Sequence, residues 1–546
     1  MKKTLSLILS VVTALSLAAC NLAPAATTEQ SGTIATTVTT ATTENPSAPS
    51  AATKESASKL LSAAIDKFFA ADSMHAKTSA TLTISSSGVS METSAFKDFY
   101  GSALTTSPVW KSTSSTTALG NEEKGETYFA EGHYYVSKYG FNAKITKSEE
   151  ADEKYGWKKT FEVFLEKLPS DVYVTYFKMN EDGSCEIKAD TACKAVMFDE
   201  YLEGMEESVA GNKAEDATVT TEAPTETAHI IIDADGNITE YRASITLPLT
   251  LSSGAQSQNF LISAEIETTV ENVGESITID EPASLYDYVH TTAEKFEYTF
   301  AQTAYNEFLK HSDVAGELYS YIAVQIGTSV TEIEATGAFA GKDYRGETPV
   351  LYNRSKITMS SSPYPYHSEI YYADGYFYVK TSERTASSNE TKKLKLTPEE
   401  YAELYGEGDG NDEIFTFFGD SAFSSAEIEY DSTTKMTNIY FNMNTSVFEL
   451  LFGEDINSVQ KLIVGNEYEI VSCDVSEAAV MLSISAAGEL KCYAIAFYIT
   501  IQFKIEGQVY TAYAYYYDYA EITQTENVTV PVPSNLDSYV SSSEQA

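Results

Sequence analysis

Hydrophobic and polar residues alternate along many stretches of this chain, in a pattern typical of β-strands. Residues 497–505 carry apolar side chains at every odd position and polar ones between them, which predicts a strand with one buried face. Residues 245–251 repeat the pattern with Ile and Leu at the odd positions. Acidic residues followed by glycine predict tight hairpin turns between such stretches. These pairs stand at residues 131–132, 182–183, 235–236 and 374–375.

A helical period appears at fewer places. Residues 60–69 and 300–309 each place apolar side chains three and four positions apart, which predicts two amphipathic helices. Thr397, Pro398 and Glu400 predict a further short helix, because they supply an N-cap, a first-turn proline and a capping-box glutamate. Residues 206–227 are acidic and rich in Thr, and we interpret them as a flexible excursion.

The chain contains an internal repeat. Residues 128–136 (YFAEGHYYV) match residues 371–379 (YYADGYFYV), and four further matches follow the same order at offsets between 240 and 252. Such order indicates a duplication. We predict two homologous α+β domains, residues 57–290 and 291–546, each an N-terminal helix plus a large curved antiparallel β-sheet with inserted short helices. The other matches pair residues 68–69 with 308–309, 149–156 with 399–406, 236–241 with 488–493 and 285–289 with 536–540.

The N-terminus has the layout of an export signal. Lys2 and Lys3 precede an apolar stretch, residues 5–17, that is shorter than the roughly 20 residues needed to span a bilayer. The stretch runs into residues 17–20 (LAAC), which resemble the lipobox of bacterial lipoproteins. The resemblance implies that residues 1–19 are a signal peptide and that the Cys20 thiol is lipidated. The alternative is an ordinary secretory signal that contains a cysteine.

Residues 20–56 are rich in Thr, Ala, Ser and Pro and hold little that a core could bury, so we expect a flexible tether. Two acyl chains anchor a protein stably, whereas one binds only marginally. The expected location is therefore the extracytoplasmic face of a bacterial cell membrane, at the cell surface. The N-terminal acyl anchor is the expected membrane contact.

The charge balance narrows the choice of partners. The chain has 36 Lys and Arg against 79 Asp and Glu, a formal net charge of −43 over 546 residues. Affinity for nucleic acid comes from counterion release by basic side chains, so this balance excludes a nucleic-acid binder that relies on bulk charge. An anionic bilayer repels the same charge, which favours domains that stand away from the lipid surface.

One long antiparallel sheet per repeat, an N-terminal helix and helices inserted mid-chain, in a lipoprotein, resemble the LolA/LppX-like fold. In that family a curved, incomplete barrel wraps helices and encloses an apolar cavity, and several members carry or present lipids. The resemblance covers most of each repeat. It implies a lipoprotein that binds an apolar or lipid ligand in its cavities.

Catalytic and metal-binding patterns are missing from the sequence. None of the six histidines has the spacing of a helical zinc site. No nucleophile, base and orienting group can be nominated together. We therefore expect a protein that is not an enzyme, with no cofactor and no bound metal.

Four cysteines follow Cys20. Cys185 and Cys193 belong to the first predicted domain, and Cys473 and Cys492 to the second. Two cysteines per domain in an exported chain permit one disulfide in each. The repeats do not place them equivalently, and buried free thiols are the alternative.

A row of tyrosines provides a second functional hypothesis. Tyr513, Tyr515, Tyr517 and Tyr519 share one face of a predicted strand. Such a row suits an adhesion or scaffolding module that binds a surface glycan or a protein, since tyrosine gives rigid amphipathic contact area. Alternatively, the row packs against the neighbouring domain or stabilises cross-strand pairs. The matching positions of the first repeat are Leu261, Ser263, Glu265 and Glu267, whose acids we expect on a solvent face.

Overall fold

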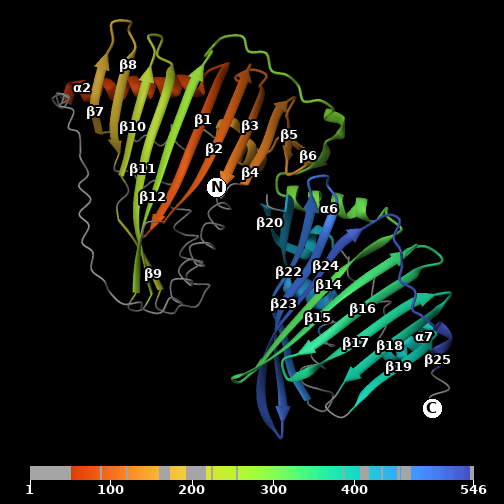
Figure 1. Ribbon diagram of the computed structural model, residues 1–546. Helices are drawn as coiled ribbons and strands as arrows, with labels where there is room; N and C mark the ends of the chain where they lie inside the picture. Colours follow the sequence, from red (N-terminus) through yellow and green to blue (C-terminus); the bar gives the residue numbers. More distant parts are fainter. Residues whose placement is uncertain are drawn as a thin grey trace. The chain divides into compact units, whose positions relative to one another are not determined.

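The chain divides into two compact units, with the boundary in the sequence between Ala293 and Glu294. Each unit is an open, mostly antiparallel β-sheet with a helix at its N-terminal end, which confirms the predicted α+β class (Figure 1). Residues 1–50, with Cys20, lie outside the described part, so the signal peptide and the lipidation stay predictions. The computed structural model describes residues 51–86, 89–118, 121–158, 161, 173–191, 217–222, 225–253, 256–384, 388–405, 417–431, 434–451, 456 and 469–541.

The first unit starts with a helix and continues mainly as hairpins. Its described elements are α2 (Ala51–Phe69), β1 (Met74–Ser86), β2 (Val89–Ser102), β3 (Val109–Ala118), β4 (Asn121–Ala130), β5 (His133–Lys138), β6 (Phe141–Thr146), α3 (Glu149–Tyr155), β7 (Tyr173–Met179), β8 (Cys185–Thr191), β9 (Ala217–Thr221), β10 (Thr225–Ile232), β11 (Ile238–Ser253), β12 (Gln256–Glu271), the 3-10 turn η1 (Leu285–Asp287) and β13 (Val289–Thr291).

The second unit follows the same plan. Its described elements are α6 (Phe296–Phe308), β14 (Val314–Ile326), β15 (Ser329–Lys342), β16 (Val350–Met359), β17 (Ser362–Ala373), β18 (Tyr376–Arg384), β19 (Asn389–Leu396), α7 (Pro398–Tyr405), η2 (Asp420–Ala422), β20 (Phe423–Asp431), β21 (Met436–Met443), α8 (Thr445–Leu451), β22 (Glu469–Ser485), β23 (Leu490–Ile505), β24 (Gln508–Gln524), η3 (Leu536–Ser538) and β25 (Val540–Ser541).

The two sheets have the same strand order. The first runs β13-β6-β5-β4-β3-β2-β1-β12-β11-β10-β8-β7, with β9 beside β11, and the second runs β25-β19-β18-β17-β16-β15-β14-β24-β23-β22-β21-β20. In both, the first long strand pairs with the last long strand, so the middle of the sheet joins the two ends of the unit. The sequence repeat is thus a repeat of the whole sheet.

The structure confirms the tight turns and the helix cap that the local sequence predicts. Glu131 and Gly132 adopt φ values of 52° and 75°, and Asp374 and Gly375 adopt 52° and 77°, as the predicted tight hairpins require. The backbone N–H of Thr397 donates to Glu400 Oε2 at 2.9 Å, and the N–H of Glu400 donates to Thr397 Oγ1 at 3.3 Å. This reciprocal pair is the predicted capping box.

Two predictions were wrong. Helix α2 begins at Ala51, so residues 51–56, predicted as tether, are helical; they are rich in good helix formers, and a Glu55–Lys59 pair at 2.7 Å supports them. Within the predicted flexible excursion, residues 217–221 lie in β9 and residues 225–227 lie in β10, while residues 206–216 and 223–224 lie outside the described part. β10 pairs with β8 and β11 on its two sides, and this backbone ladder orders a Thr-rich segment that β-structure tolerates well.

Side chains alternate between an inner face, which carries the helices, and an outer face. On β23, Phe497, Ile499 and Ile501 are buried on the inner face, whereas Tyr498 is 48% exposed on the outer face. Helix α2 lies across the first sheet near β7 and β11 (Figure 1). Helix α6 packs against β20, β22 and β23, α8 against β22, and α7 against β18 and β19. The helices of the second unit therefore concentrate towards the two ends of its sheet.

A strap crosses the outer face of each sheet after the last long strand. In the first unit the strap is residues 272–288, and its Tyr288 packs against Tyr128 and Tyr135. The rings of Tyr135 and Tyr288 meet edge to face with centroids 5.5 Å apart. The strap then delivers β13, which pairs in parallel with β6 at the far edge.

The second strap, residues 525–539, makes the same contact. The rings of Tyr378 and Tyr539 lie 5.6 Å apart at 87°, and Val528 packs against Tyr352 and Tyr371. Strand β25 then pairs in parallel with β19. In each unit, therefore, one repeated motif (residues 128–136 or 371–379) forms a hairpin, and another (residues 285–289 or 536–540) is the end of the strap that packs against that hairpin.

Truncation of a strap tyrosine tests this role. We expect Tyr288→Ala to lower the free energy of unfolding of the first unit by about 2–4 kcal/mol, because it removes a buried aromatic side chain. Tyr286, fully exposed in the same strap, supplies the control, and Tyr286→Ala should change stability by less than about 0.5 kcal/mol. Denaturant unfolding of both variants checks this, and equal effects would refute the assigned role.

Candidate functional site

The inner face of the first sheet is filled with aromatic rings over β2–β5. Phe99 on β2 lies 5.7 Å from Trp157 and 5.9 Å from Trp110 on β3, measured between ring centroids. Phe68 of α2 reaches Phe161 at 5.3 Å. Phe129 and Tyr134 continue the cluster along β4 and β5. Rings from helix and sheet thus pack together over the inner face of β2–β5.

The second sheet has smaller side chains at the matching place. The strand register puts Leu351 where the first sheet has Trp110. Leu351 is buried, but its side chain is smaller than the indole of Trp110. Phe377 stacks on Tyr401 of α7 at 4.1 Å, towards the β19 edge. Phe339 of β15 keeps the place of Phe99, and Phe497 of β23 stacks on Tyr516 of β24 at 4.6 Å, so the second inner face differs from the first at this place by lacking the indole of Trp110.

Between the two groups of helices lies an apolar strip that is only partly covered. Ile322 and Ile333 are half-buried, Ile326 is 36% exposed and Met359 is 39% exposed. The strip shares one face of β14, β15 and β16, because these side chains are in register across the strands. We call this set the inner strip; its members are Leu318, Ile322, Ile326, Ile333, Ile357 and Met359.

The tyrosine row lies on the outer face of β24. Tyr515 packs against Tyr498 at 4.7 Å and against Tyr321 at 6.3 Å, between ring centroids. Tyr513 is 57% exposed, while Tyr517 is partly buried. The row is therefore one line in a wider outer tyrosine patch. The patch consists of Tyr319, Tyr321, Tyr498, Tyr513, Tyr515, Tyr517 and Tyr519.

Several phenols of this patch have raised pKa values. The Tyr321 hydroxyl donates to Glu332 Oε1 at 2.7 Å, which with partial burial raises the pKa of Tyr321 to about 12. Burial raises the pKa of Tyr515 and of Tyr517 as well. The patch thus offers uncharged hydroxyls beside apolar ring edges.

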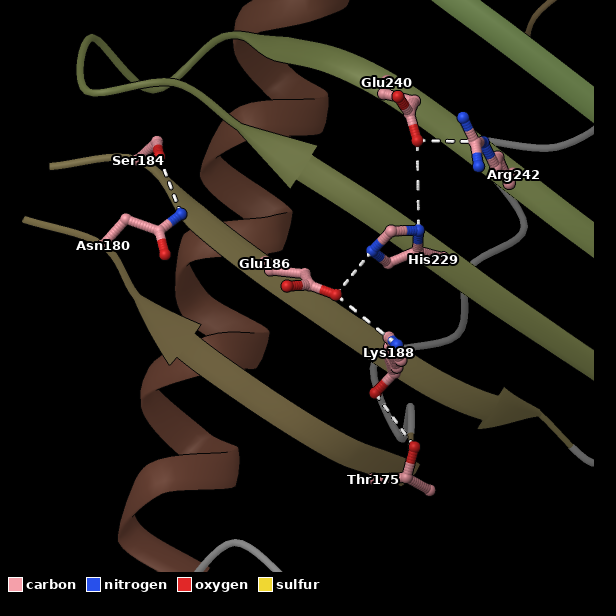
Figure 2. Close-up of polar contacts among 8 residues, drawn as sticks. All are labelled: Thr175, Asn180, Ser184, Glu186, Lys188, His229, Glu240 and Arg242. Carbon is pink, nitrogen blue, oxygen red and sulfur yellow. Dashed lines mark hydrogen bonds and ion pairs between the residues drawn. The ribbon is translucent and has the colours of Figure 1, made fainter. Parts of the chain in front are cut away.

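The first sheet presents charge at the corresponding place. His229 Nε2 lies 2.9 Å from Glu186, its Nδ1 lies 3.9 Å from Glu240, and Arg242 Nε lies 2.9 Å from Glu240 (Figure 2). The register puts Met481 and Ala494 of the second sheet where the first has His229 and Arg242. Glu265 and Glu267 are exposed, as expected of a solvent face. The two outer faces have therefore diverged from ion pairs to aromatic packing.

The disulfide considered between Cys473 and Cys492 is absent. Neither sulfur forms a disulfide, and Cys473 lies opposite Ile501, nine residues along β23 from Cys492. At about 3.3 Å per residue that spacing is roughly 30 Å, several times what a disulfide spans. The Cys492 sulfur instead contacts the Tyr519 hydroxyl at 3.0 Å. Cys185 is also a free, buried thiol, and Cys193 lies outside the described residues.

Other candidate sites in the described part of the chain are weak. A pocket of about 380 Å³ on the first sheet is lined by Phe96 together with polar and charged residues such as Thr113, Lys124 and Glu126. No cluster of three His, Cys, Asp or Glu among the described residues could hold a metal ion. None of the helices described is both long and apolar enough to cross a membrane.

Comparisons with known proteins add structural likenesses. No protein-family model matches the chain, and no curated protein matches it significantly. It is similar to LprF from Mycobacterium bovis at 10% identity and a TM-score of 0.22, over 43% of this chain and 100% of that one. A DUF1329 family protein from Desulfovibrio piger matches at 10% identity and 0.14, over 43% and 95%. A putative AttH from Nitrosomonas europaea matches at 8% and 0.13, over 81% and 92%.

A lysine on the first inner face gives a pH-dependent test of this packing. Burial lowers the pKa of Lys97 to about 8, and Lys97 lies two residues from Phe99 on β2. The unfolded chain, where lysine has a pKa of about 10.4, therefore binds more protons between those two pH values. The free energy of unfolding should rise as the pH rises through this window.

We expect Lys97→Met to stabilise the first unit at pH 7 by about 1–3 kcal/mol, because it removes a protonated amine from an unfavourable site. The gain should shrink between about pH 8 and 10.4. Lys77→Met, on the exposed outer face of β1, is the control and should show no such change. Denaturant unfolding across this pH range measures both, and parallel pH profiles would contradict the burial of Lys97.

Proposed function

We propose that this protein is a membrane-anchored, extracytoplasmic lipoprotein, not an enzyme, whose second unit binds an apolar or lipid ligand on its inner strip. The observation that carries the proposal is the partly exposed apolar surface at Ile326, Ile333 and Met359. Such a surface gains roughly 25 cal/mol for each Å² that a ligand removes from water. The filled inner face over β2–β5 of the first unit offers no comparable surface.

The proposed anchor is the lipidated Cys20 at the end of residues 1–20. In the sequence, the first unit, which begins with α2, comes before the second and is therefore separated from the anchor by fewer residues. Without Lys2 and Lys3 the anchored chain has 34 Lys and Arg against 79 Asp and Glu, a charge of −45, which anionic lipid headgroups would repel. A ligand would therefore reach the inner strip from the aqueous side.

Ligand binding can be tested with a charge placed on the inner strip. Residues 21–546, purified without detergent and incubated with a long-chain monoacylglycerol, should show a discrete adduct by native mass spectrometry. We expect Ile333→Glu to abolish the adduct, because a carboxylate in contact with an acyl chain loses its hydration. Thr336→Glu places the same charge on the exposed outer face of the same strand and should retain the adduct.

Two outcomes would decide against the proposal. An unliganded mass for the wild-type chain in repeated preparations would exclude the lipid. Equal loss of the adduct in both variants, with unchanged circular dichroism, would place the ligand somewhere other than the inner strip.

A second candidate function is binding of a surface glycan through the outer tyrosine patch. The supporting observation is the exposure of Tyr513 and Tyr498, at 57% and 48%, beside neutral phenols. We expect Tyr513→Ala to weaken binding to immobilised cell-wall glycan at least threefold without loss of stability, because this ring lies mostly in solvent. Tyr510→Ala, on the opposite side-chain alternation of β24, serves as the control. Equal affinity in wild type and Tyr513→Ala would remove this candidate.

A further inference from the structure

One carboxyl group lies on the inner face of the second sheet, beside the inner strip. Asp518 of β24 stands between Ile495 of β23 and Ser320 of β14 in the strand register. The Tyr516 hydroxyl donates to Asp518 Oδ2 at 2.7 Å, and the Ser320 hydroxyl also donates to this carboxyl. None of the three polar side chains is fully buried.

The first unit has no such group. Its register pairs Ala80 with Ile266 at the positions that correspond to Ser320 and Asp518. Ala264 corresponds to Tyr516, since it pairs with Ile245 of β11 as Tyr516 pairs with Phe497 of β23. Three neighbouring inner positions are thus apolar in one copy and hydroxyl or carboxyl in the other. A polar cluster confined to one copy is not required by the fold.

The cluster lies at one end of the inner strip. From Ser320 the register continues through Ala335 to Ile357 and then Tyr366 of β17. At about 4.8 Å between strands, Tyr366 lies roughly 19 Å from Asp518 across the sheet. A polar group at one end and an apolar row beside it match the two parts of an amphiphile.

We propose that Asp518, with Ser320 and Tyr516, is a headgroup subsite that accepts hydrogen bonds from an uncharged or cationic polar head and excludes an anionic one. The inference rests on the proposed function, because the inner strip would hold the acyl part of the same ligand. The headgroup subsite would distinguish amphiphiles by the charge of their polar heads, which an apolar surface alone cannot do.

The carboxyl group can take further donors. Burial raises the pKa of Asp518, against which the Ser320 and Tyr516 hydroxyl donors act only in part. An ionised carboxylate accepts about four hydrogen bonds, so two donors leave capacity for hydroxyl or ammonium groups of a ligand. A phosphate or carboxylate head would instead place like charge beside a partly buried carboxylate, which is unfavourable.

The experiment compares two probes that differ in the head alone: a long-chain monoacylglycerol and the fatty acid with the same acyl chain, both with residues 21–546. We expect the wild-type chain to bind the monoacylglycerol at least tenfold more tightly at pH 8. Asp518→Ile, which installs the residue of the first unit, should reduce this ratio at least fivefold. Asp518→Asn, close in shape, should raise fatty-acid affinity and guards against misfolding of the first variant.

Glu521→Gln removes a carboxylate from the exposed outer side of the same strand and should leave the ratio unchanged. Ratios that stay the same in both Asp518 variants, with both probes still bound, would overturn the headgroup subsite and keep the proposed function. Failure of both probes to bind the wild-type chain would overturn the proposed function and the subsite together. A change in stability without a change in ratio would assign Asp518 a structural role only.

Discussion

An open β-sheet has two faces, and every apolar side chain on either face must be covered by something. In this protein each unit meets the constraint with one N-terminal helix, a few short helices and a strap on the opposite side. The straps and their tyrosines cover the outer face near β4–β5 and β17–β18. The described helices contact only some of the strands on each inner face, and the remaining strands are covered differently in the two units. Aromatic rings fill the first, whereas the second keeps a partly exposed strip.

Duplication explains why the units share a plan and differ in surface chemistry. Strand order, the glycine turns at 131–132 and 374–375 and the strap contact are the same in both copies, because each shapes or covers the sheet. Positions outside those contacts have diverged: Trp110 against Leu351, Ile266 against Asp518, and the His229 ion pairs against tyrosine packing. The repeated motifs therefore mark the scaffold, and the differences between copies mark the candidate sites.

The outer tyrosine patch shows how one pattern supports two interpretations. Tyr515 and Tyr517 pack against neighbouring rings on adjacent strands, which is the cross-strand role expected of tyrosine in sheets. Tyr513 and Tyr498 remain largely exposed on the same face. Structural packing thus accounts for the middle of the row and leaves its exposed members as the part that a glycan would contact.

The sequence by itself determined the strands, the hairpin turns, the capping box at Thr397, the two copies and the faces of β23 and β24. Each depends on local spacing of a few residues, which the chain displays directly. It could not determine that the Thr-rich residues 217–221 and 225–227 are paired or that Cys473 and Cys492 lie far apart, because both outcomes depend on which strands become neighbours. The helix at residues 51–56 was missed for another reason, since its support, good helix formers and the Glu55–Lys59 pair, is local. The inner strip and the Asp518 cluster exist only because β24, β14, β15 and β16 align side chains nearly 200 residues apart, and only tertiary structure decides that alignment.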